Sequence, residues 1–307
     1  MKKNVRLYAL CMVCILAVQL FVATCPAYAE ETGEKENKEH VLLFTADLHD
    51  QVEEKLIPFL KRYKETVDQT EYICYGGDYA KQFDEKILKR LVRINQQLFP
   101  SAKSVYTVGN HDMAGFDKEK FQYITNMKER GNVIKKGGYV LYTFGASSKE
   151  QQFTETDVKE LKEFLETTRE YIPRIPIIIV SHFPIHYFEN GKDKRQTKGS
   201  EELVKLLNAF SNVVFLYGHN HSVNDTSYGV IHMPGDEITI GKNEFRTINF
   251  CYTSLGAMKD GANQEIYALK ITIKNTVCCN QVMLEHLNYY AEPKDKMMVC
   301  FPLVEEY

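Results

Sequence analysis

Five short apolar runs of this 307-residue sequence end in histidine, aspartate or asparagine. The last run ends in Gly218-His219-Asn220-His221, which places two imidazoles one residue apart. Neutral imidazoles, carboxylates and amide oxygens are the ligands that proteins use for Zn, Mn, Fe and similar divalent ions. The other four runs end in groups of the same kind, which are Asp47-Leu48-His49, Asp78, Asn110-His111-Asp112 and His182.

Each of these groups alone has an ordinary explanation. An Asp-x-His sequence after a strand usually forms a turn, and the glycine pair before Asp78 is a common strand ending. By itself, His182 would most often be a hydrogen-bonded histidine at a strand end. The hypothesis of a metal site therefore rests on the five groups together, because such an ending is repeated at every one of these strands.

The spacing of apolar residues predicts the elements that position these groups. Helical periodicity over 52–67 and 116–128, and after the capping box Thr154-x-x-Asp157, predicts helices between strands. The predicted strands are residues 41–46, 72–75, 104–108, 177–180 and 213–217. In open α/β sheets the carboxyl ends of parallel strands share one edge, where ligands bind. We therefore expect the five groups to converge.

The end of the chain has a different pattern from the rest. From about residue 226 the helical periodicity stops, and strand-like runs follow near 246–254, 264–274, 277–284 and 297–303. The order is thus β/α alternation followed by an all-β tail. Since there is no internal repeat or linker within 41–307, these residues are predicted to form one domain.

The number of candidate ligands indicates more than one ion. The seven are Asp47, His49, Asp78, Asn110, His182, His219 and His221. Seven ligands exceed one tetrahedral site and suit two ions that share a bridging carboxylate. Two such ions clamp the attacking and leaving oxygens of an in-line displacement and acidify a shared water. This chemistry favours hydrolysis of a phosphoester by a metal-bridging hydroxide.

The ordered set of motifs over 47–221 resembles the calcineurin-like metallophosphoesterases. The resemblance implies an α/β fold in which two mixed β-sheets pack as a sandwich flanked by helices, in four α/β/β/α layers. It assigns Asp47, His49 and His221 to one ion, Asn110, His182 and His219 to the other, and Asp78 to both. It gives His111 the protonation of the leaving-group oxygen and Asp112 the orientation of the His111 ring.

At one position the sequence differs from a subgroup of this family. Purple acid phosphatases have a tyrosine three residues after the bridging aspartate, and that position is Lys81 here. An iron–tyrosinate centre is therefore not expected. The two divalent ions could be Mn, Zn, Fe or Mg.

The first 29 residues are predicted to be a secretory signal peptide, because basic residues precede the apolar run Leu7–Thr24, and Ala27-Tyr28-Ala29 after it matches a small-x-small cleavage site. Residues 30–40 are predicted to be a charged linker. The expected location is secreted or extracytoplasmic, or the cell surface if the leader stays uncleaved as an anchor. After cleavage no stable membrane insertion is expected.

The charge of the chain limits the partners that can be expected. The leader holds three of the 38 basic residues and none of the 41 acidic ones, so the rest of the chain is acidic. Nucleic acid is therefore not an expected partner, and a small phosphate ester is the expected substrate.

The five cysteines after the leader allow one disulfide among the last four. The alternative function is an extracellular binding or scaffold protein that retains metal without turnover, which loss of a ligand or of His111 would have favoured.

Overall fold

The computed structural model describes residues 38–302, except 68, 172–174, 186–187, 190–191, 194–196, 221–229, 241–242, 246, 256–267, 277–278 and 289. The chain divides into two compact units, Met1–Lys38 and Glu39–Tyr307, and all described residues except Lys38 belong to the second. The predicted leader and most of the predicted linker lie outside the described residues. Within the described part of the chain, no helix has the length and apolar composition to cross a membrane.

The described residues contain two six-stranded sheets, each of them mixed. The first has the order β16-β15-β14-β1-β2-β3, in which β1, β2 and β3 are parallel and the others antiparallel. Its strands are β1 (Glu39–Thr45), β2 (Tyr72–Tyr75), β3 (Lys103–Tyr106), β14 (Ala268–Asn275), β15 (Cys279–Leu287) and β16 (Pro293–Pro302). Strand β1 begins two residues inside the predicted linker, because Glu39 and His40 pair with β14.

The second sheet has the order β10-β13-β9-β6-β5-β4, with four parallel strands between two antiparallel edge strands. Its strands are β4 (Val133–Lys135), β5 (Val140–Phe144), β6 (Ile177–Ser181), β9 (Val213–Tyr217), β10 (Ile231–His232) and β13 (Cys251–Ser254). Two small hairpins accompany it, formed by β7 (Phe188–Glu189) with β8 (Lys192–Asp193) and β11 (Ile238–Ile240) with β12 (Asn243–Phe245).

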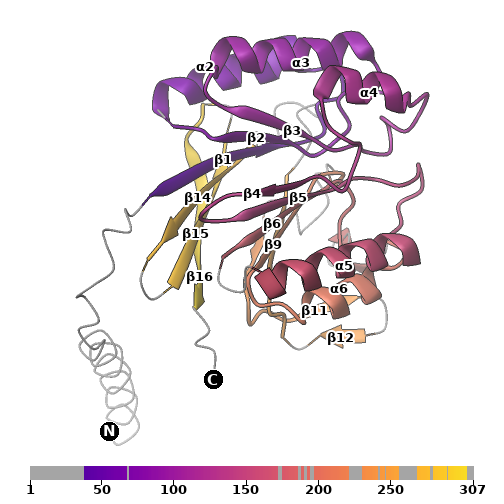
Figure 1. Ribbon diagram of the computed structural model, residues 1–307, viewed down its shortest axis with the longest axis vertical. Helices are drawn as coiled ribbons and strands as arrows, with labels where there is room; N and C mark the ends of the chain where they lie inside the picture. The colour runs from indigo at the N-terminus through magenta and orange to yellow at the C-terminus, as the bar shows by residue number, and fades with distance from the viewer. Residues whose placement is uncertain are drawn as a thin grey trace, which may run out of the picture. The chain divides into compact units, whose positions relative to one another are not determined.

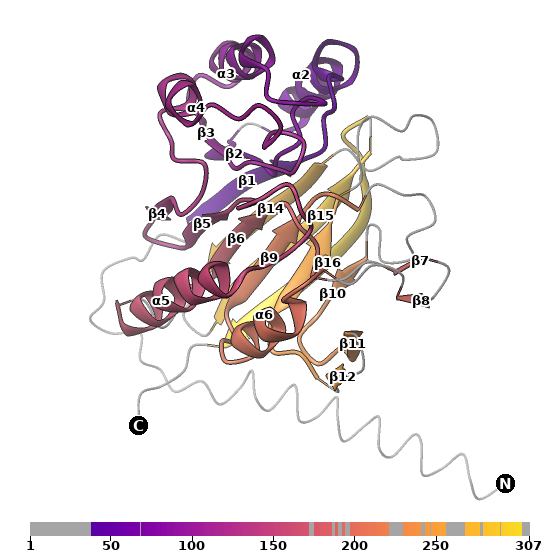
Figure 2. The same cartoon turned by 90° about the vertical axis from the view of Figure 1, so that its right-hand side faces the viewer.

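Helices cover the outer face of each sheet (Figures 1 and 2). Over the first sheet lie a π-helical turn η1 (Val52–Leu56), α2 (Ile57–Thr66), α3 (Glu85–Leu98) and α4 (Lys118–Thr125). Over the second lie α5 (Glu155–Tyr171) and α6 (Ser200–Leu207). The predicted capping box forms before α5: Thr154 N donates to Asp157 Oδ2 at 2.8 Å, and Asp157 N donates to Thr154 Oγ1 at 3.1 Å.

Alternation along the strands places the core in three layers. Phe44 and Cys74 of the first sheet face Ile178 and Leu216 of the second, and all four are buried between the sheets. The residues that alternate with these along each strand lie on the outer face of its sheet and pack under the helices. The expected sandwich of two mixed sheets flanked by helices is therefore confirmed.

The tail strands differ in place and extent from the sequence prediction. They serve both sheets, because β14, β15 and β16 extend the first sheet while β10 and β13 extend the second. Of the predicted run 246–254, the described residues 247–250 form no strand and β13 begins at Cys251, while the predicted helix 116–128 ends at Thr125. Asn126 stops that helix by adopting the left-handed conformation, with φ 56°. Cys74, Cys251 and Cys279 are free thiols, and Cys278 lies outside the described residues.

Candidate metal centre

The carboxyl ends of five strands, three from one sheet and two from the other, meet at one place. Backbone and side-chain hydrogen bonds join them across the sandwich. His219 N, after β9, donates to Asp47 Oδ2, after β1, at 2.8 Å. His182 Nδ1, after β6, donates to the carbonyl oxygen of Gly76, after β2, at 2.8 Å. Side chains from separate strands are thereby held in contact.

Two clusters of potential ligand atoms form there and share one carboxylate. The first cluster is His49, Asp78 and His111, and the second cluster is Asp78, His182 and His219. In each cluster one ligand atom per residue lies within 4.8 Å of the others. Asp78 belongs to both, so the structure gives its carboxylate the central position between them.

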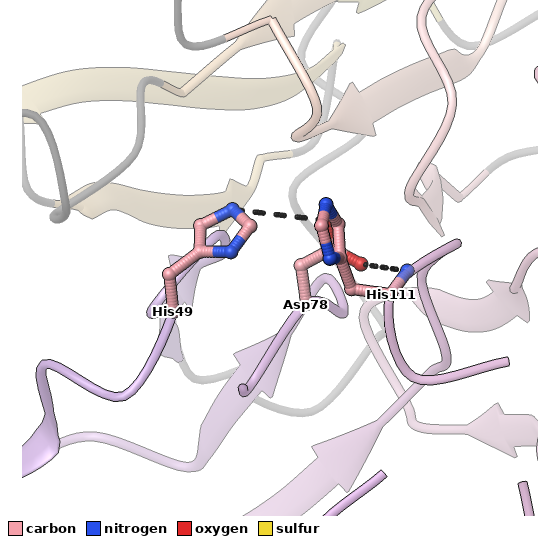
Figure 3. Close-up of side chains that lie close together, drawn as sticks. All are labelled: His49, Asp78 and His111. Carbon is pink, nitrogen blue, oxygen red and sulfur yellow. Dashed lines mark hydrogen bonds and ion pairs between the residues drawn. The ribbon is translucent and has the colours of Figure 1, made fainter. Parts of the chain in front are cut away.

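The first cluster contains imidazoles from two loops around the Asp78 carboxylate (Figure 3). His49 Nε2 lies 3.8 Å from Asp78 Oδ2 and 3.9 Å from Asp47 Oδ1. The rings of His49 and His111 stand edge to face, with centroids 4.9 Å apart. Asp47, His49 and Asp78 are buried, whereas His111 is partly exposed. In this cluster the side chains of His49 and Asp78 are thus shielded from solvent, whereas the His111 imidazole is partly accessible.

The second cluster is tighter and includes the Asn110 amide. His182 Nε2 lies 2.9 Å from Asn110 Oδ1 and 3.4 Å from Asp78 Oδ2. His219 Nδ1 lies 2.9 Å from the same Asn110 oxygen and 3.3 Å from His182 Nε2. Because His182 Nδ1 donates to a carbonyl oxygen, Nε2 of the neutral ring offers its lone pair to the cluster.

Charge at the site suits a cation. Burial alone would raise the pKa of Asp78, but the imidazoles of His182, His49 and His111 lower it well below its ordinary value. For His182 the balance is reversed: burial lowers the pKa, while Asp78 and Asp47 raise it to about 9. The negative potential that favours a proton on His182 also favours a divalent ion, and ligation displaces such protons. The donor set therefore fits hard or borderline divalent metals.

Backbone strain is concentrated at these residues. Asp47, His49, Asp78 and His219 adopt left-handed φ values of 54°, 42°, 55° and 66°. Residues other than glycine pay roughly 1–3 kcal/mol for such conformations, which persist where the surroundings impose them and cluster at functional sites. Here the backbone hydrogen bonds of the loops impose them; for example, Asp47 N donates to Gly77 O at 3.0 Å and His49 N to Asp78 O at 3.1 Å.

Two glycines leave the space that the carboxylates occupy. A Cβ at Gly109 would lie 2.2 Å from Asp78 Oδ1, and one at Gly218 would lie 2.3 Å from Asp47 Oδ2. Both distances are shorter than any normal contact, so only glycine lets the backbone approach the two carboxylates this closely.

Asp112 does not orient the ring of His111, contrary to the sequence prediction. Its carboxylate accepts the backbone N–H groups of Asp78, Tyr79 and Gly109 at 2.7, 3.1 and 2.8 Å. The ring of His111 instead donates from Nδ1 to the carbonyl oxygen of Lys81 at 3.1 Å. Asp112 is turned toward the backbone because these buried N–H groups need an acceptor. It supports the loop that carries Asp78.

Of the nine site residues that the sequence predicts, eight lie within the described part of the chain, and the ninth, His221, lies outside it. Sequence reasoning did not identify the carbonyl of Lys81 or the side chain of Gln151, whose Oε1 lies 3.2 Å from His219 Nε2. No sequence signal marks either one, since any residue has a carbonyl and Gln151 belongs to no motif.

Comparison with solved structures supports the fold. The purple acid phosphatase PPD1 from yellow lupin (Lupinus luteus) matches with 11% identity and a TM-score of 0.57, over 86% of this chain and 54% of that one. A 5'-nucleotidase precursor from Thermus thermophilus matches with 10% identity and a TM-score of 0.44, over 87% and 55%. Vps29 from Chaetomium thermophilum matches with 7% identity and a TM-score of 0.39, over 86% and 98%.

The chain spans about half the length of the first two of these proteins, and the likeness in fold is carried by the first. A comparison with curated protein sequences finds no match. The sequence profile of one family, by contrast, matches residues 40–223, which include both clusters. The chain belongs to the calcineurin-like phosphoesterase family, whose members use divalent metal ions.

Proposed function

We propose that this protein hydrolyses a small phosphoester with the help of two divalent metal ions and acts outside the cytoplasm. The observation that supports two ions is the position of Asp78, whose carboxylate belongs to both clusters. A single ion could be bound by only one of the two clusters, and the ligand atoms of the other cluster would then bind no metal.

The residues have distinct roles in this proposal. Asp47, His49 and Asp78 would hold one ion, with His221 as the further ligand that the family resemblance assigns. Asp78, Asn110, His182 and His219 would hold the other. When bound, such a pair polarises the phosphoryl oxygens and lowers the pKa of a water molecule so that it can act as a nucleophile near neutral pH.

His111 is the residue placed to exchange a proton with the leaving group. It is partly exposed while its neighbours in the first cluster are buried. Since Nδ1 donates to the Lys81 carbonyl, Nε2 is the atom that would carry the proton to the departing alkoxide. The main-chain N–H of His111 donates to Asp78 Oδ1 at 2.9 Å, which ties the His111 backbone to the shared carboxylate.

The test is metal content per chain combined with hydrolysis of an aryl phosphate and a bis-aryl phosphate by the purified protein. We expect two ions per chain, turnover of at least one substrate, loss of turnover on chelation and its return with Mn²⁺ or Zn²⁺. Two ions with no turnover of either substrate would favour the metal-retaining binding protein instead. One ion or none after loading would refute the two-ion proposal.

The extracytoplasmic location rests on the sequence of the leader alone. We expect the mature protein to begin at about residue 30, after Ala27-Tyr28-Ala29. Fractionation of cells that produce the full chain, followed by N-terminal sequencing, tests this. Recovery of the intact N-terminus in the membrane fraction would indicate an uncleaved anchor, and recovery in the cytoplasm would refute secretion.

A further inference from the structure

We propose that Gln151 is a positioning residue that fixes the tautomer and orientation of His219 in the second cluster. This inference rests on the proposed two-ion function, because His219 matters to it as a ligand of the second ion. Gln151 lies in the loop between β5 and α5, which belongs to none of the five motif-bearing strand ends.

The contact defines which nitrogen of His219 carries the hydrogen. Gln151 Oε1 lies 3.2 Å from His219 Nε2. An amide oxygen can only accept, so Nε2 must be the protonated nitrogen. Nδ1 faces Asn110 Oδ1 and His182 Nε2, at 2.9 and 3.3 Å. An ion bound among these atoms would take the lone pair of Nδ1 in place of a proton, and the hydrogen would remain on Nε2. Outer partners of this kind fix the tautomer of histidine ligands.

The amide of Gln151 is itself held in this orientation. Its Nε2 donates to Thr197 Oγ1 at 2.9 Å, and Thr197 is fully buried. Thr197 in turn accepts from Ser200 at the start of α6, with its carbonyl oxygen 3.0 Å from Ser200 N and 2.6 Å from Ser200 Oγ. With the amide nitrogen bound to Thr197, the amide oxygen faces His219.

The loop that carries Gln151 is anchored on both sides of it. Asp157 Oδ2 accepts from Ser147 Oγ and from Thr154 N, each at 2.8 Å. Phe153 N donates to Lys198 O at 2.7 Å, and Gly199 approaches so closely that a Cβ there would lie 2.1 Å from Phe153 O. A support on such a fixed loop can hold a ligand to the accuracy that a metal site needs.

The two histidines of the second cluster differ in how they are supported, which makes the inference testable. His182 donates to a backbone carbonyl, that of Gly76, which no substitution removes. His219 Nε2 contacts a side chain, that of Gln151, so substitution can remove this contact from one ligand of the cluster while the first cluster keeps its own residues.

The experiment titrates the metal-free full-length protein with Zn²⁺ against a chromophoric chelator. The variants are Gln151→Leu, which removes the amide at similar size, and Gln151→Glu, which keeps an acceptor oxygen. The matched control is Gln152→Leu, since the amide of Gln152 bonds to Ser148 of the same loop at 3.2 Å. In the Zn²⁺-loaded protein, long-range ¹H–¹⁵N spectra report which nitrogen of His219 carries the hydrogen and how fast it exchanges.

We expect Gln151→Leu to weaken one of the two binding steps by about 10–100-fold and to leave the other unchanged, as outer-partner substitutions do. Gln151→Glu should restore most of this loss, and Gln152→Leu should bind like the unchanged protein. The hydrogen on His219 Nε2 should exchange faster in Gln151→Leu.

Three results would overturn the inference while leaving the proposed function intact: both steps unchanged in Gln151→Leu, both steps weakened alike, or an equal effect in Gln152→Leu. An unchanged protein that takes up fewer than two ions would overturn the proposed function and this inference together.

Discussion

Replacing Gly109 with alanine should disable the metal centre through a single methyl group. The added Cβ would lie 2.2 Å from Asp78 Oδ1 and 2.7 Å from His182 Cε1. Carbon atoms of this type are not found closer than 3.0 Å to their neighbours, so the Asp78 oxygen would have to move by about 0.8 Å. Because Asp78 belongs to both clusters, one displacement disturbs both proposed ions.

The surroundings of Asp78 leave it little freedom to move without loss. Its Oδ1 accepts from His111 N at 2.9 Å, and its own N–H donates to Asp112 at 2.7 Å. Overpacking of a buried site costs about 1–3 kcal/mol of stability. Misplacement by about 1 Å can lower a catalysed rate about 100-fold. We therefore expect a folded protein with reduced metal content and roughly a 100-fold lower kcat/KM.

The assay combines three measurements on Gly109→Ala: metal content by mass spectrometry, kcat/KM on an aryl phosphate, and the midpoint of urea unfolding. The matched control is Gly137→Ala, where a Cβ meets nothing within 4 Å; its metal content and rate should equal those of the unchanged protein. Full metal content and rate in Gly109→Ala would refute the close-approach reasoning. So would an equal loss in the control.

Three further predictions follow from the contacts. Asp78→Ala should lose both ions, which metal analysis checks, and a variant that retained two ions would contradict the shared position of Asp78. His111→Ala should keep its metal but lose about 10²–10⁴-fold in turnover, most of all with poor leaving groups; equal rates with good and poor leaving groups would contradict proton transfer at His111. At Asp157, burial raises the pKa, but the N–H of Thr154 and the charge and hydrogen bond of Arg130 outweigh it and lower the pKa below 3.8. The ionised carboxylate of Asp157 therefore stabilises the fold fully at pH values above 3.8, the ordinary pKa. This contribution is lost as the pH falls through the lowered pKa of the folded state. Asp157→Asn should therefore cost about 1–3 kcal/mol at pH 7, and urea unfolding should show this difference shrinking below about pH 4; a difference independent of pH would contradict the role of the charge.

The strands that carry the ligands could be predicted because their signals are local. Each is a run of apolar residues that leads to a polar group, as Val213–Tyr217 leads through Gly218 to His219, and burial on both faces makes such runs continuous. The pairing of the tail strands is different, since β14 joins β1 across most of the chain. Nothing in the sequence of either strand specifies that partner, so the division of the tail between two sheets emerged only from the structure.

The same distinction separates the ligands from the groups that hold them. A ligand must be one of a few residue types, and a strand end brings it to the site, so type and position together identify it. A supporting group needs only an oxygen or an N–H in the right place. The carbonyl of Lys81 reaches His111 over 30 residues of sequence, and Gln151 reaches His219 over 68. Asp112 belongs to one of the motifs, but the sequence around it does not indicate that its carboxylate accepts backbone N–H groups from a distant part of the chain. The left-handed backbone of Asp47, Asp78 and His219 is likewise invisible in the sequence, because these residue types occur far more often in ordinary conformations. Sequence therefore shows which atoms can bind a metal, whereas the accuracy with which they are held depends on long-range contacts made by residues of ordinary type.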